Sequence, residues 1–228
     1  IQMRKYFGPE HGLLSSKREK NQDQIMRHKN KMKDEKLATL PKMYELKDHT
    51  NTMYRNENWR AFIINYLLIT FNVRNKDLDL IIVSSKRRAN DPNENYLILR
   101  KNDIIYVRRN YKTMKSYGEK SNLFKSQKMR KAIQKLIERH TGKPYQYPFH
   151  DPVLLMSKQN GDRIDNDSVH YFVRRHTLNG LGEGDYNKIA VSEIREFEDF
   201  KKLQQLSKNR GTSIDNVMTE YNLLFKET

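Results

Sequence analysis

Residues 56–73, NENWRAFIINYLLITFNV, are the most hydrophobic stretch of this 228-residue chain. Apolar side chains recur there at helical spacing and together surround most of the helix: Trp59, Phe62, Ile63, Ile64, Tyr66, Leu67, Leu68 and Ile69. A helix that is apolar nearly all round is buried in the protein interior. The stretch therefore predicts a central core helix, which ends at a turn or new cap marked by Asn75 and Asp77.

The segments around this helix predict an α+β fold that is mainly helical. A short helix precedes it, with Pro41 near the first turn, and two β-rich runs at 96–99 and 103–109 predict a hairpin. Further helices are expected at 126–141, at 166–178 and from Lys188 onward, with a break at Arg210–Gly211. Since strands and helices do not alternate, we expect a small antiparallel sheet rather than a parallel one.

The composition excludes several classes of protein. There is no cysteine, so disulfides, thiolate nucleophiles and cysteine-ligated metals are excluded. No apolar run approaches the 18 or so residues of a transmembrane helix, and the N-terminus lacks the apolar core of a signal peptide. The chain also lacks an initiator Met, as a processed or trimmed product would.

The strong positive charge indicates a polyanionic partner. Lys and Arg number 44 against 28 Asp and Glu, a formal net charge of +16. Nucleic acid is the leading candidate, an anionic membrane surface comes second, and simple solubility is the remaining explanation. Residues 1–35 hold nine Lys or Arg against five Asp or Glu, so the remainder of the chain is basic in its own right.

Four segments carry, in chain order, an arginine, a lysine, a second arginine and a tyrosine. They are NYLLITFNVRNKDLDL (65–80), IIYVRRNYKTMKSYG (104–118), NKIAVSEIREFEDF (187–200) and LSKNRGTSIDNVMTEYN (206–222). Their order, spacing and context resemble the catalytic domain of the tyrosine recombinases, in particular the divergent forms of large DNA viruses and Crypton-type transposons. The resemblance covers residues 37–225. It implies a catalytic domain over 37–228, preceded by a basic arm or core-binding remnant over 1–36.

The resemblance also implies roles for individual residues. Arg74 and Arg195 correspond to the two catalytic arginines, Lys112 to the catalytic lysine with Lys115 as the reserve, and Tyr221 to the nucleophile. Tyr221 follows Thr212 by nine residues, which is the family spacing between histidine and tyrosine.

Both histidine positions of the family are substituted in this chain. Ser192 stands three residues before Arg195, and Thr212 follows Gly211. These hydroxyls can donate hydrogen bonds but cannot act as bases at neutral pH.

The implied reaction needs neither metal nor cofactor. The tyrosine oxygen attacks a phosphodiester and forms a 3′-phosphotyrosine, which conserves the bond energy for rejoining. The two arginines would stabilise the negative charge of the transition state, and the lysine would protonate the departing 5′-oxygen. The seven histidines are scattered; a metal at His150–Asp151 or at His170 and His176 is less expected than ordinary surface or core histidines.

The expected partner is double-stranded DNA, bound by a homodimer or homotetramer, with no membrane contact. The location would be intracellular, wherever the DNA is: nucleus, viral factory or virion. The side chains expected to contact DNA are Arg87, Arg88, Lys115, Arg174, Arg175 and Arg210. One alternative is a catalytically inactive DNA-binding or virion protein with the same fold, and another is a basic structural protein that never meets DNA.

Overall fold

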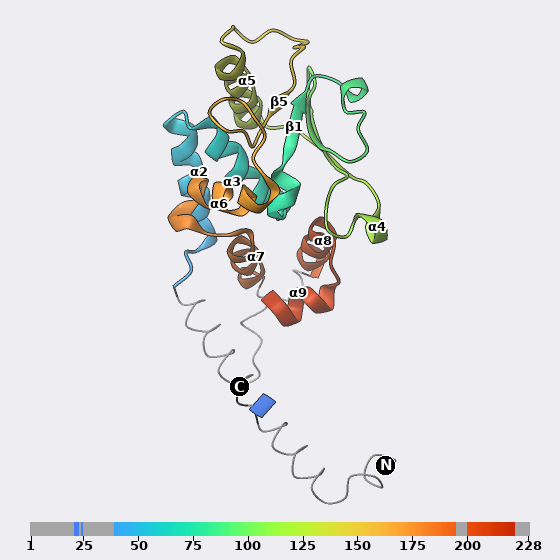
Figure 1. Cartoon of the computed structure of the whole chain (residues 1–228). Coiled ribbons are helices and arrows are strands. Elements are labelled where there is room, and N and C mark those ends of the chain that lie inside the picture. Colours follow the sequence, from blue (N-terminus) through green and yellow to red (C-terminus); the bar gives the residue numbers. More distant parts are fainter. Residues whose placement is uncertain (1–20, 23, 25–38, 195–199, 222–228) are drawn as a thin grey trace, which may run out of the picture. The chain divides into compact units, whose positions relative to one another are not determined.

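Helices make up about half of the chain that the computed structural model describes, namely residues 21–22, 24, 39–194 and 200–221 (Figure 1). The described residues from Pro41 onward belong to one compact unit. The helices are α2 (Met43–Arg55), α3 (Trp59–Phe71), α4 (Met114–Tyr117), α5 (Gln127–Thr141), α6 (Val169–His176), α7 (Glu183–Ser192), α8 (Phe200–Arg210) and α9 (Ile214–Tyr221). The strands are β1 (Leu80–Val83), β2 (Asn95–Leu99), β3 (Ile104–Arg108), β4 (Lys120–Phe124) and β5 (Val153–Leu154). The predicted α+β class is confirmed.

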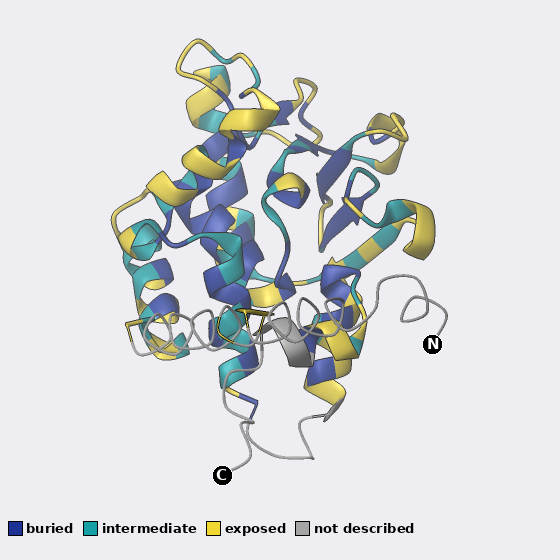
Figure 2. Ribbon diagram, turned by 60° about the horizontal axis from the view of Figure 1, so that its bottom comes forward, coloured by how far each residue is buried: buried dark blue, intermediate teal, exposed yellow. Residues whose placement is uncertain are grey.

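Helix α3 is the centre of the hydrophobic core, as the sequence predicts. Most of its residues are buried, and it packs against α2, α5, α6, α7 and α8. Figure 2 shows the same distribution, with exposed residues on outer helical turns and loops and the inner helices and strands mostly buried. The helix begins after Asn58, whose side chain accepts a hydrogen bond from the Ala61 N–H, and ends at Asn72 in the left-handed conformation.

A buried amide connects α3 to two later helices. The Asn65 side chain, fully buried, donates to the carbonyl oxygens of Ala61 and His176 and accepts from the Tyr186 hydroxyl. Every polar atom of the amide therefore has a partner, which removes most of the penalty for burying it. These bonds fix α6 and α7 against the middle of α3.

The sheet is mixed, which corrects the predicted antiparallel sheet. Its strand order is β4-β3-β2-β1-β5. The predicted hairpin is present as antiparallel β2 and β3, but β1 pairs parallel with β2. The connection over residues 84–94, which contains the short 3₁₀ turn η2 (Lys86–Arg88), is long enough to carry the chain back to the level at which β1 begins. Strand β2 can therefore run in the same direction as β1.

The sheet buries side chains on both faces. On one face, Phe71 of α3 packs edge-on against Tyr106 of β3 and Phe124 of β4, with ring centroids 5.6 and 5.2 Å apart. On the other face, a separate cluster consists of Val83, Ala89, Tyr96, Ile98, Ile105 and Val107. Ala89 belongs to the 84–94 connection, so this connection covers the face that α3 does not.

The remaining elements match the sequence expectations in part. Helices α2, α5 and α6 lie where periodicity predicts them, and α5 ends at Gly142 in the left-handed conformation. Strand β4 occupies what the sequence shows only as a polar stretch. The helix expected from Lys188 begins earlier, at Glu183, and ends at Ser192. None of the described helices is both long and apolar enough to cross a membrane.

The first prediction tests the central role of α3. Leu67→Ala removes a fully buried side chain and is expected to lower the free energy of unfolding by about 2–5 kcal/mol, because a cavity remains. Thr70→Ala, on the exposed side of the same helix, is the control and should change it by less than about 0.5 kcal/mol. Urea titration followed by circular dichroism measures both, and equal losses would contradict a core centred on α3.

Candidate functional site

Arg74 lies in the turn that follows α3. Its backbone N–H donates to Oδ2 of Asp77 at 3.1 Å, which caps the 3₁₀ turn η1 (Asn75–Leu78). The side chain is half-buried, and its Nη1 has no hydrogen-bond partner among the described residues. Arg74 thus has a fixed backbone and a guanidinium whose hydrogen-bonding capacity is not fully used by the protein.

A buried ion pair supports this turn. Nη1 of Arg108 lies 3.5 Å from Oδ2 of Asp77, and the two side chains are 1% and 2% exposed. The Arg108 guanidinium also donates to the Asn209 carbonyl at 2.7 Å and to Oδ1 of Asn122 at 3.3 Å. Burial raises the pKa of Asp77, while the charge of Arg108 opposes that shift. One arginine therefore joins the Arg74 turn, β4 and the end of α8.

Arg74 and Lys112 line the same pocket, although they belong to different elements. We call this cavity of about 770 Å³ the Arg74 pocket. Its wall is rich in charged and amide side chains: Arg74, Asn75, Lys76, Lys112, Asn166, Asp167, Val169, His170 and Glu183. Since Arg74, Lys76 and Lys112 outnumber the two carboxylates, the pocket favours an anionic ligand.

Glu183 connects the Arg74 pocket to the last helices. Its carboxylate accepts from the backbone N–H of Asn75 and lies 3.4 Å from Nη2 of Arg210. Burial raises the pKa of Glu183, and both partners counteract that shift. Arg210 is only 4% exposed, so its side chain lies behind the pocket and not on a surface that DNA could touch.

The segment that carries Lys112 is fixed to the loop before α9. Thr113 Oγ1 donates to the Gly211 carbonyl at 2.8 Å. Gly211 has a φ of +64°, and a Cβ there would lie 2.5 Å from Thr113 Oγ1, so only glycine fits. The segments containing Lys112 and Thr212 are therefore neighbours in space.

Lys120 is a titratable group beside these segments. Its ammonium lies 5.0 Å from the Tyr111 ring centroid and donates to the carbonyls of Lys208 and Asn209 at the end of α8. Burial, together with the charge of Arg108, lowers its pKa to about 8. A lysine of this pKa can exchange its proton near neutral pH.

Two other predicted catalytic residues, Ser192 and Thr212, do not line the Arg74 pocket. The Ser192 hydroxyl donates to the Ile189 carbonyl of its own helix at 2.8 Å. Oγ1 of Thr212 accepts from Nδ2 of Asn216 at 3.3 Å. Arg195 lies outside the described residues, and so does the side chain of Tyr221, whose backbone ends α9.

Five of the six residues expected to contact DNA are exposed: Arg87, Arg88, Lys115, Arg174 and Arg175. Arg88 is partly engaged, because its guanidinium contacts the carbonyl oxygen and Nδ1 of His150. The sixth is the buried Arg210 described above. Within the described residues, no group of three His, Asp or Glu side chains is arranged to hold a metal ion.

Sequence reasoning misses Arg108, Lys120 and Glu183. Their importance comes from contacts with residues far away in the chain, such as Arg108 with Asn209. The only local signal is that a charged residue, Arg108, ends a run of apolar strand residues, where pairing or a special environment is required.

Comparison with family models, with curated proteins and with solved structures finds no match to this chain. The functional assignment therefore depends on the chain's own residues and their geometry.

The second prediction concerns the buried ion pair. Asp77→Ala leaves the Arg108 guanidinium buried without its counter-charge and is expected to lower the free energy of unfolding by about 3–5 kcal/mol. Asp79→Ala is the control: its partner Arg163 keeps Glu94, so the loss should be about 1 kcal/mol or less. Chemical denaturation of both variants decides, and similar losses would refute the special role of the buried pair.

The third prediction concerns the pKa of Lys120. Because that pKa falls from 10.5 to about 8 on folding, the unfolded chain binds more protons between these values. Lys120 therefore makes stability increase with pH from about 8 to 10.5, and the wild type should gain stability relative to Lys120→Met over this range. Thermal melts at several pH values measure the difference. Lys115→Met, exposed on α4, is the control and should run parallel to the wild type.

Proposed function

We propose that this chain binds double-stranded DNA and cuts and rejoins its strands through a 3′-phosphotyrosine intermediate. The observation that carries the proposal is that Arg74 and Lys112 line one pocket. The bond from Thr113 to Gly211 adds to it, because the loop before the Tyr221 helix lies beside that same segment.

Each residue has a defined role in this reaction. The Arg74 guanidinium binds the non-bridging oxygens of the scissile phosphate and stabilises the charge that develops there. The Lys112 ammonium protonates the departing 5′-oxygen. Tyr221 supplies the attacking oxygen and Arg195 a second cation; both assignments depend on the sequence pattern.

The electrostatics of the Arg74 pocket are compatible with a phosphate. Of its two carboxylates, Glu183 already accepts from the Asn75 N–H and faces Arg210, so much of its charge is compensated. Exposed Arg87, Arg174 and Arg175 supply positive charge to the protein surface. Such sequence-independent contacts provide most of the affinity of a protein for DNA. Assembly of two or four copies on DNA, in the compartment that holds it, is part of the same proposal.

A catalytically inactive DNA-binding or virion protein is the second candidate. It is favoured by the state of Ser192, whose hydroxyl proton is donated within α7 and which cannot act as a base. Thr212 likewise replaces a basic side chain. General acid–base groups contribute about 100–10,000-fold to rate, so an enzyme lacking both histidines is expected to be slow.

The fourth prediction tests strand transfer directly. The full chain is incubated with nicked duplexes that contain a randomised segment, so that the unknown target sequence does not limit the assay. A covalent protein–DNA adduct should form, and proteolysis followed by mass spectrometry should locate the phosphate on Tyr221. Tyr221→Phe should abolish the adduct, and Arg74→Ala or Lys112→Ala should reduce it at least 100-fold.

Tyr171→Phe is the matched control, because Tyr171 is 64% exposed on α6 and should leave adduct formation unchanged. Salt-sensitive DNA binding without any adduct would overturn strand transfer in favour of the inactive DNA-binding protein. Absence of salt-sensitive binding would overturn both candidates and leave a basic structural protein.

A further inference from the structure

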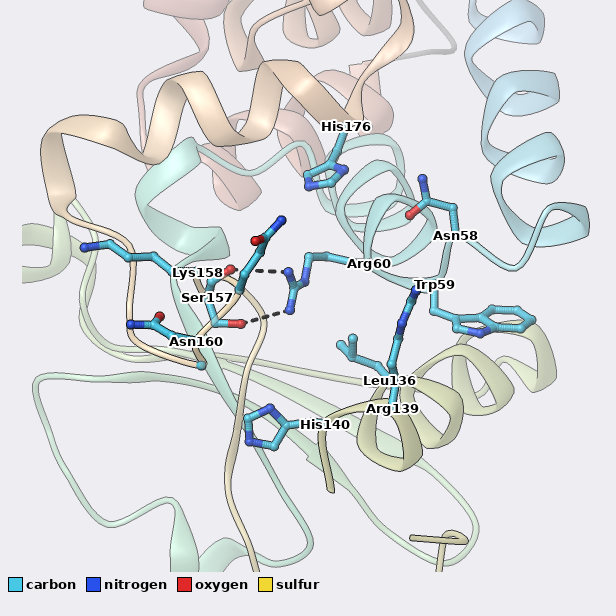
Figure 3. Close-up of a pocket in the computed structure, with 12 residues that line it drawn as sticks. Asn58, Trp59, Arg60, Leu136, Arg139, His140, Ser157, Lys158, Asn160 and His176 are labelled. Carbon is cyan, nitrogen blue, oxygen red and sulfur yellow. Dashed lines mark hydrogen bonds between the residues drawn. The ribbon is translucent and has the colours of Figure 1, made fainter. Parts of the chain in front are cut away.

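A second basic pocket lies at the N-terminal end of α3, whereas Arg74 follows the C-terminal end. The 13 residues of α3 separate the two ends by about 20 Å. This cavity, which we call the Arg60 pocket, has a volume of about 520 Å³ (Figure 3). It is lined by Asn58, Trp59, Arg60, Leu136, Arg139, His140, Ser157, Lys158, Gln159, Asn160, Gly161 and His176.

Arg60 is held at the centre of these residues. Its guanidinium donates to the carbonyl of Ser157 at 3.3 Å and to the Ser157 hydroxyl at 2.9 Å, as Figure 3 shows. Its Nε is buried without a hydrogen-bond partner among the described residues. No carboxylate of the described chain forms an ion pair with Arg60, so neutral partners alone fix this charge.

Among the described residues that line the cavity, Arg139 and Lys158 are further cations and none is a carboxylate. Arg139 extends from α5 toward Arg60, and burial, together with the charge of Arg139, lowers the pKa of Arg60. Lys158 also lines the pocket, although its ammonium lies 3.4 Å from Asp165 outside it. Burial and the charge of Arg60 lower the pKa of His176 to about 4, so its imidazole is neutral at pH 7.

The backbone adds to this positive potential. The first turn of α3 faces the pocket through Asn58, Trp59 and Arg60, and it contains no acidic residue. The N-terminal end of a helix carries a partial positive charge, which favours anions. Bringing cations together in a partly buried cavity is unfavourable, and an anionic ligand would relieve that repulsion.

We propose that the Arg60 pocket binds a phosphate-bearing anion. Arg139 and Lys158, both exposed, would contact the phosphate oxygens, and Arg60 would supply charge from the cavity wall. Arginine suits this role, because its planar guanidinium binds two oxygens at once. The phosphate belongs either to a small free polyphosphate or to the DNA backbone. The site is distinct from the Arg74 pocket and does not depend on strand transfer.

The fifth prediction uses Trp59 as an internal reporter. Trp59 is the only tryptophan of the chain and lines the Arg60 pocket, so its fluorescence reports on this pocket and not on the Arg74 pocket. Titration of the full chain with inorganic tripolyphosphate at constant ionic strength should give a saturable change in fluorescence. Arg139→Gln should weaken the apparent affinity at least about tenfold, the scale of one lost charged hydrogen bond.

Lys135→Gln is the matched control, because this substitution also removes one positive charge from α5. Lys135 lies one turn before Arg139 and outside the pocket. This variant should bind like the wild type. Lys158→Gln is a second variant, on the loop rather than a helix, and should weaken binding even if Arg139→Gln fails to fold. Equal weakening by Lys135→Gln, or no saturable change at all, would overturn the proposal.

Two further arms distinguish the sources of the phosphate and separate this proposal from strand transfer. A DNA duplex that produces the Arg139-dependent fluorescence change, while tripolyphosphate does not, assigns the pocket to the DNA backbone; the reverse result assigns it to a free polyphosphate. Tyr221→Phe should bind tripolyphosphate like the wild type. If the covalent adduct does not form, the proposal that the Arg60 pocket binds phosphate is therefore not contradicted.

Discussion

The buried ion pair between Arg108 and Asp77 is the contact on which the rest of the structure depends. It holds the turn after α3 against β3, and the same guanidinium reaches Asn122 in β4 and the Asn209 carbonyl at the end of α8. A charge in such a place is tolerated only when it is paired and hydrogen-bonded, so these partners hold Arg108 in a fixed position. This ion pair therefore fixes the position of the turn that carries Arg74 in the Arg74 pocket.

The elements that local patterns determine are those the sequence predicts well. The apolar circumference of α3, the stop at Gly142 and the two runs around the β2–β3 turn each depend on neighbouring residues only. The parallel pairing of β1 with β2 depends instead on how the 84–94 connection packs, through Ala89, on the sheet. Strand β4 has only partly buried or exposed residues, so its alternation gives a weak signal.

The candidate site likewise contains some residues that the sequence predicts and others that only the structure reveals. Arg74 and Lys112 are predicted from the family resemblance of the segments that carry them, and both line one pocket in the structure. Glu183, Lys120 and Arg108 are not predicted as site residues, because each acquires its role from a partner 27 or more residues away in the chain. Arg210 shows the opposite error: its charge suggested a DNA contact, whereas its burial beside Glu183 makes it part of the support.

The hydrogen bond between Thr113 and Gly211 mechanically couples the segment that carries Lys112 to the loop before α9. Because a backbone carbonyl and a glycine without room for a Cβ join the segments, the loop before α9 cannot shift without moving the Lys112 segment or breaking this bond. Any partner that repositions α9 therefore also changes the surroundings of Lys112, and a ligand held by Lys112 acts back on α9 to the same extent.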